Sequence, residues 1–177
     1  MYKLLEDYME KNTIVALYTN KDNYEAFAVG YINKIINDKV IILHIGVHGE
    51  FDGYSSCYVE DIYRVETNSK YIMKLSKLKG WDIPDVPKVN YNEDCFDSLI
   101  VSAYKNNEII AIRCCDSETD IRGYIINYSD LSMTILQINE YGEDDGQTTI
   151  YTNDISKVAI MDVECKEIDK LYHIGKV

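Results

Sequence analysis

The sequence is poor in the features that mark several large classes of protein. It has 2 prolines and 9 glycines in 177 residues, and it has no apolar run close to the length of a membrane span. Near the N-terminus, Glu6, Asp7 and Glu10 stand where a secretory signal would be basic and then apolar. We therefore expect a cytoplasmic protein with no membrane partner.

The cysteines have neither the spacing of a metal site nor that of a secreted disulfide framework. They are odd in number, and two of them are adjacent: Cys57, Cys95, Cys114, Cys115 and Cys165. This pattern favours reduced thiols that are buried as small apolar side chains.

Catalytic and metal-binding patterns are also missing. The sequence has no nucleophile motif and no glycine-rich phosphate loop. His44 and His48 would lie about 13 Å apart along an extended strand, too far for one ion. The acidic segment 143–145 lacks the alternating ligands of a calcium loop. We therefore predict no catalytic residue, no metal site and no cofactor, and hence a protein that is not an enzyme.

Basic residues are in deficit, with 18 Lys and Arg against 30 Asp and Glu, a net charge of −12. Residues 1–80 carry 10 basic and 11 acidic side chains, a net charge of −1. Residues 81–177 carry 8 and 19, a net charge of −11. The second half should repel polyanions at long range, so only the first half is neutral enough to approach nucleic acid.

What the sequence does contain is an internal repeat. The segment 30–65 aligns without a gap with 123–158, at an offset of 93 residues. The identical pairs are mostly turn glycines and apolar strand positions, among them Gly30/Gly123, Ile42/Ile135, Gly53/Gly146, Asp61/Asp154 and Val65/Val158. What recurs is therefore what a fold requires rather than a set of reactive groups.

Each copy shows a helical pattern followed by strand patterns. The apolar spacing predicts helices around residues 4–9 and 96–104, and strands at 14–18, 27–31, 40–45 and 54–59 with counterparts in the second copy. Asp61 and Asp154 favour short 3₁₀ turns before a last strand. Residues 70–79 read as a short amphipathic helix that is basic on one side.

The pattern predicts a mainly β protein with α-helices, a tandem duplication of a helix plus a five-stranded antiparallel small barrel. Both prolines, Pro84 and Pro87, fall in one polar stretch between the copies. We therefore expect a first repeat at 1–79, an ordered linker at 80–92 and a second repeat at 93–177.

This arrangement resembles Sm-like and other SH3-like small barrels, with Gly30 and Gly123 at the glycine of the second strand. The resemblance implies the fold. Sm proteins hold a nucleotide base with an Asp, an Asn and an Arg-Gly pair. The matching positions here hold Ile36, Val40, Glu60, Asp61, Ser129, Met133, Asn153 and Asp154, so the resemblance does not extend to a uridine pocket.

Two functions remain open at this point. The first is a non-enzymatic protein-interaction module, such as an adaptor, a regulatory protein or an immunity protein, that binds a basic protein partner. Its candidate residues come from the abundant tyrosines and from the acidic turn: Tyr54, Tyr58, Tyr63, Glu143, Asp144 and Asp145. The alternative is an Sm-like single-stranded RNA-binding protein that uses Arg64, Lys70 and Lys74 of the first barrel. The sequence does not reveal whether copies of the chain associate.

Overall fold

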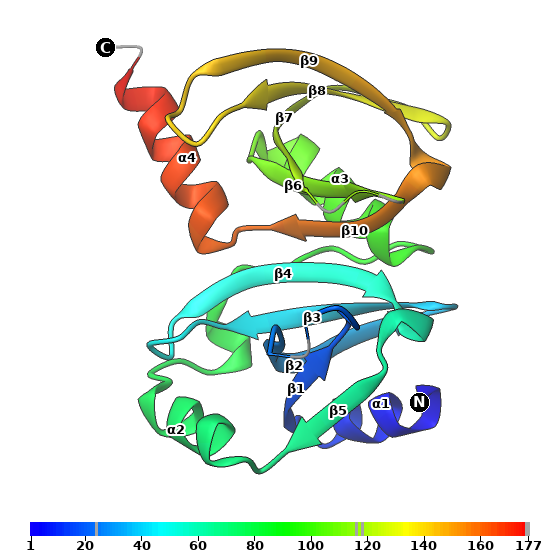
Figure 1. Ribbon diagram of the computed structural model, residues 1–177, viewed down its shortest axis with the longest axis vertical. Helices are drawn as coiled ribbons and strands as arrows, with labels where there is room; N and C mark the ends of the chain where they lie inside the picture. The colour runs from blue at the N-terminus through cyan, green and yellow to red at the C-terminus, as the bar shows by residue number, and fades with distance from the viewer. Residues whose placement is uncertain (24, 116, 118, 176–177) are drawn as a thin grey trace.

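The structure is a computed structural model that describes residues 1–177 apart from 24, 116, 118, 176 and 177 (Figure 1). The first half of the chain contains α1 (Tyr2–Glu10), β1 (Ile14–Tyr18), β2 (Ala28–Ile36), β3 (Lys39–Ile45), β4 (Phe51–Tyr58), β5 (Arg64–Thr67) and α2 (Lys70–Leu78). The second half contains α3 (Cys95–Asn106), β6 (Ile110–Cys114), β7 (Ile121–Tyr128), β8 (Ser132–Ile138), β9 (Asp144–Tyr151), β10 (Ile155–Ile160) and α4 (Val163–Ile174). Short 3₁₀ helices occur at η1 (Val59–Asp61), η2 (Ile83–Asp85) and η3 (Thr152–Asp154).

The elements follow the sequence patterns closely. The strand expected at 14–18 is β1, the amphipathic helix expected at 70–79 is α2, and both 3₁₀ turns form. Three of the helices have an N-cap residue whose side chain accepts a hydrogen bond from a backbone N–H of the first turn. These residues are Ser69 for α2, Asp94 for α3 and Asp162 for α4. Within the described residues, no helix is long and apolar enough to cross a membrane.

The ten strands of the described residues form one antiparallel sheet in the order β5-β1-β2-β3-β4-β10-β6-β7-β8-β9. The mixed α and β class is therefore confirmed, but the expected pair of closed barrels is not. The reason is visible in Figure 1, where β4 of the first half lies beside β10 of the second. β4 pairs with β3 on one side and with β10, rather than with β5, on the other. The sheet therefore stays open and ends at β5 and β9.

The two halves nevertheless share one strand order and one register. The order β5-β1-β2-β3-β4 recurs as β10-β6-β7-β8-β9. Gly30 faces His44 across β2 and β3, and Gly123 faces Gln137 across β7 and β8. A Cβ at Gly30 would lie 2.0 Å from the carbonyl oxygen of Leu43, and one at Gly123 would lie 1.9 Å from that of Leu136. Both strands therefore bend at a point that only glycine can occupy.

The junction between the halves is formed by β4 and β10. Ser55 pairs with Ala159 and Tyr54 with Ile160, so the strands run antiparallel along four residues. At the start of β4, Asp52 Oδ1 accepts a hydrogen bond of 2.8 Å from the backbone N–H of Val163, the first residue of α4. The start of α4 is thus bound to the first residues of β4.

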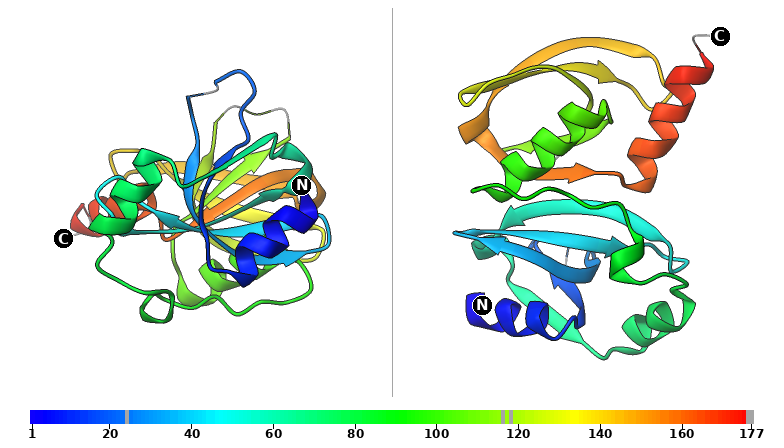
Figure 2. Two further views of the ribbon diagram at one scale, coloured as in Figure 1. Left: turned by 90° about the horizontal axis from the view of Figure 1, so that it is seen from below. Right: turned by 180° about the vertical axis from the view of Figure 1, so that it is seen from behind.

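The largest core cluster belongs to both halves. It unites side chains of β1 to β4 with side chains of α3, β6, β8 and β10. Helix α3 packs on β10, β4, β7, β3 and β2, so it covers the junction from one side, as the view from behind shows (Figure 2). Leu99 and Ile110 in this cluster are fully buried. Two smaller clusters lie under α1 and under α4.

The segment expected as a linker is ordered. Asp82 and Asp85 form a reciprocal capping box around η2, and Val86 and Val89 are buried. The indole N–H of Trp81 donates to the carbonyl oxygen of Gly49 at 2.9 Å, and the ring packs edge-on against Tyr31 and Phe51. The linker therefore covers the first half rather than separating two independent bodies.

We expect the bend glycines to control stability. Replacing Gly30 by Ala places the new Cβ inside the contact distance of a backbone carbonyl that cannot rotate away, which should cost about 2–4 kcal/mol of unfolding free energy. Gly80→Ala is the matched control, because a Cβ there meets nothing within 4 Å. Urea unfolding followed by circular dichroism measures both. Equal midpoints for the two variants would contradict this account of the bend.

Candidate protein-binding surface

The first candidate surface is the acidic turn between β8 and β9. Asn139 fixes this turn, since its Oδ1 accepts from the backbone N–H of Glu143 at 3.0 Å and its Nδ2 donates to the Glu143 carboxylate at 3.1 Å. Gly142 has a positive φ of 75° and packs against the backbone of α4. Asp144 and Asp145, which we expected in the turn, are the first residues of β9 and are exposed.

Strand β9 is an edge of the sheet, and it extends this acidic surface. It pairs with β8 on one side, where the hydroxyls of Thr134 and Thr149 lie 2.9 Å apart, and it ends the strand order on the other. Tyr151 at its end is 68% exposed. An edge of this kind presents backbone N–H and C=O groups that can pair with another strand.

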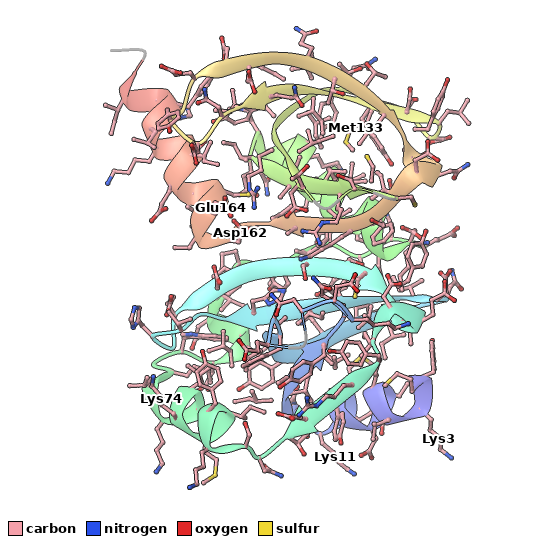
Figure 3. The ribbon with its side chains drawn as sticks, in the orientation of Figure 1. Lys3, Lys11, Lys74, Met133, Asp162 and Glu164 are labelled. Carbon is pink, nitrogen blue, oxygen red and sulfur yellow. The ribbon has the colours of Figure 1, made fainter. Side chains whose placement is uncertain are left out.

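The second candidate surface lies at the opposite edge, on β5 and α2. Lys70, Lys74 and Lys77 of α2 are exposed, and between them Met73 is 51% exposed. Figure 3 shows Lys74 projecting outwards from α2, whereas Asp162 and Glu164 lie at the start of α4 near the junction. The surface of α2 is therefore basic with an apolar centre.

Arg64 on β5 has partners within its own half. Its guanidinium lies 4.4 Å from the ring centre of Tyr18 and forms an ion pair with Glu66. Tyr18 also donates a hydrogen bond to the Glu66 carboxylate at 3.1 Å. These contacts hold Arg64 against the first half, so its charge is partly neutralised.

The three tyrosines that we singled out lie in different places. Tyr54 is 2% exposed and donates its hydroxyl to the carbonyl oxygen of Pro87 at 2.8 Å. Burial raises the pKa of Tyr54, and the side chain is part of the core rather than of a surface. Tyr58 is half-buried against Phe96 of α3, and Tyr63 is exposed beside Tyr18. The structure therefore does not gather them into one binding surface.

A polar hollow that the sequence analysis missed lies within the second half. It measures about 580 Å³, and its walls carry the ion pairs Arg113–Asp120 at 2.7 Å and Arg122–Glu164 at 2.6 Å. The available signal in the sequence was Arg113 in β6 with Asp120 and Arg122 on either side of the first residue of β7. The Arg122–Glu164 pair joins β7 to the first turn of α4, whereas Arg113–Asp120 joins β6 to the residue before β7.

The buried thiols are in states that disfavour nucleophilic chemistry. Cys57, Cys95 and Cys165 are buried, as expected, and desolvation raises the pKa of Cys57 to about 12 and that of Cys95 to about 11. Cys114 is half-buried and Cys115 is exposed, so the expectation of burial is wrong for Cys115. Exposure follows from its position just after β6 ends at Cys114.

His44 belongs to the interior of the junction rather than to a metal site. Its Nε2 lies 2.6 Å from the hydroxyl of Ser55 on β4. Desolvation, and then the nearby charge of Lys157 on β10, lower the pKa of His44 to about 4. Among the residues that the structure describes, no three His, Cys, Asp or Glu side chains are placed to hold a metal ion.

Comparison of the chain with models of protein families, with curated proteins and with solved structures finds no match.

The low pKa of His44 leads to a dependence of stability on pH. Between about pH 6.5 and pH 4 the unfolded chain binds a proton at His44 that the folded chain does not, so the folded state loses stability as the pH falls. We expect this loss to be about 1–2 kcal/mol from pH 7 to pH 5, since the pKa of His44 falls from 6.5 to about 4 on folding. His44→Gln, which carries the residue found at position 137, should not show it.

Urea unfolding of the wild-type protein and of His44→Gln at several pH values measures how the unfolding free energy of each depends on pH. All other titrating groups are the same in the two proteins, so the difference between the curves belongs to His44. Parallel curves of unfolding free energy against pH for the wild-type protein and His44→Gln would contradict the assignment.

Proposed function

We propose that the protein is a non-enzymatic protein-interaction module that takes up an extended segment of a basic partner along β9. The observation that carries this proposal is the open edge of β9 with the exposed carboxylates of Glu143, Asp144 and Asp145 at one end. Backbone hydrogen bonds to β9 would supply affinity, and the carboxylates would select lysine or arginine and accelerate association.

We further propose that each half is an Sm-like or SH3-like barrel unit, related to the other by duplication and opened where the two units join. The shared strand order, the matching register at Gly30 and Gly123, and the helix before each set of strands support this proposal. Such a unit positions an edge strand on a rigid, bent sheet, which is what strand addition requires.

The alternative, binding of single-stranded RNA by the first half, has weaker support. Arg64 is engaged with Glu66 and Tyr18, and Tyr18 packs with Phe27 and Tyr63 into one aromatic group. Stacking of bases needs aromatic faces that are free beside cations. The exposed Lys70 and Lys74 remain the candidates for phosphate contacts in this alternative.

Binding of a labelled synthetic peptide tests the proposal. The probe alternates lysine with valine or threonine over about eight residues, the length of an ordinary strand. The triple variant Glu143→Gln, Asp144→Asn, Asp145→Asn should bind it about tenfold more weakly, mainly through slower association, and with a smaller dependence on salt. Stopped-flow fluorescence measures the rates.

The matched control removes the same charge elsewhere, by Asp22→Asn, Glu93→Gln and Glu167→Gln, three exposed positions away from β9. It should behave as the wild-type protein does. An equal loss of peptide affinity in both triple variants would show that only net charge matters, and it would contradict a site at β9. Binding of single-stranded RNA tighter than about 1 μM at physiological salt would favour the alternative instead.

A further inference from the structure

The two open edges of the sheet are the counterparts of the two strands that form the junction. Within the chain, β4 of the first half pairs with β10 of the second. By strand order, β9 is the counterpart of β4, and β5 is the counterpart of β10. Each edge of the sheet is therefore one strand of a pairing that the chain already contains in full, at the β4–β10 junction.

We propose that β9 of one chain pairs with β5 of a second copy, head to tail, in the register of the β4–β10 junction. This inference rests on the proposed function, because it assigns an occupant to the same open edge. The offset of 93 residues converts the observed pairs Lys157–Cys57 and Val158–Ser56 into Arg64–Ile150 and Val65–Thr149 between chains. Every position in the pairing then has a counterpart in the structure.

The backbone at the start of β9 has the shape that this contact needs. Gly53 at the junction has a positive φ of 74°, and a Cβ there would lie 2.2 Å from the carbonyl oxygen of Ile160 in β10. Its counterpart Gly146 has a φ of 82°, yet a Cβ there meets nothing within 4 Å. The same tight backbone is therefore kept at a place where, in the single chain, nothing approaches it.

The helices that follow β10 and its counterpart β5 have equivalent caps. Asp162 caps α4 by accepting from Cys165 N–H, and Ser69 caps α2 by accepting from Ile72 N–H. At the junction, Asp52 adds a second acceptor for the first turn of α4, at Val163. The counterpart of Asp52 is Asp145 and that of Val163 is Lys70, so Asp145 of one chain is placed to accept from Lys70 N–H of the next.

Charge favours the same contact. The segment that would meet α2 carries Glu143 of the turn and Asp144 and Asp145 of β9, and the exposed surface of α2 carries Lys70 and Lys74. Opposite charges on a helix of one chain and an edge strand of another attract the two chains to each other. Salt screens this attraction, so the affinity should fall at high salt. The two surfaces that the sequence analysis had assigned to different functions thus complement each other.

Exposed apolar side chains lie where the junction has buried ones. Leu99 of α3 is fully buried, and Phe96 packs edge-on against Tyr58 of β4. In the first half, Leu4 stands at the position of Leu99 in the helix pattern and is 42% exposed. Tyr151, the counterpart of Tyr58, is exposed at the end of β9. A second copy docked on β9 would bring its α1 over this end of the strand, as α3 lies over β4.

A contact of this kind is heterologous, so it repeats until the chains close into a ring or extend as a filament. Analytical ultracentrifugation of the full chain is the test, at increasing protein concentration in low salt and in about 0.5 M salt. We expect species at multiples of 20.5 kDa in low salt and dissociation in high salt.

Two variants block the two faces separately. Gly146→Asn fills the open space beside the start of β9, and Asn tolerates a positive φ. The pair Lys70→Glu and Lys74→Glu reverses the charge of α2. Each variant alone should be monomeric, and an equimolar mixture should form a heterodimer and nothing larger, because one intact β9 then meets one intact β5.

The matched control is Lys88→Glu with Lys105→Glu, two exposed lysines outside β5, α2 and β9. It should assemble as the wild-type chain does, and circular dichroism should show a native spectrum for every variant. A wild-type chain that stays monomeric at all concentrations, or a mixture that does not pair, would overturn the inference. If that monomer still binds the basic peptide, the proposed function stands without self-assembly. Assembly without peptide binding supports the inference and contradicts a separate basic partner.

Discussion

The hydrogen bonding of β4 to β10 is the constraint on which the rest of the structure depends. It joins two five-stranded units into one sheet, and it brings α3, the first helix of the second half, across strands of the first half. The largest core cluster exists only because of this pairing, since its side chains come from both halves. His44 is held between Ser55 of β4 and the nearby charge of Lys157 on β10, so its titration also depends on the junction.

The repeat at an offset of 93 residues predicted most of the elements because it concerns local geometry. Gly30 and Gly123 report a close approach of backbone, and apolar alternation reports which face of a strand is buried. Closure of the sheet could not be predicted in the same way. Backbone groups of β4 bond equally well to β5 or to β10, and side chains such as Ser55 and Ser56, polar yet buried, indicate no particular neighbour.

The candidate surface was predictable only in part, for a related reason. Net charge identified the acidic segment at Glu143, because charge is a property of the sequence. Whether β9 has one neighbour or two is a property of the whole sheet, and no alternation pattern reveals it. The abundance of tyrosine likewise does not separate Tyr54, which is buried by the linker at Pro87, from Tyr151, which is exposed at the open edge.

The same pairing geometry has different consequences within a chain and between chains. At β10 the paired positions include Val158 and Ile160, both fully buried, and the linker keeps β10 close to β4 at all times. This raises the effective concentration of the two strands, so the junction forms as part of folding. At β5 the counterparts are Val65 and Thr67, which are only half-buried. An edge strand with less apolar area and no covalent link to its partner loses the full translational and rotational entropy when it associates. Its pairing therefore depends on protein concentration and salt, whereas pairing at the internal junction does not.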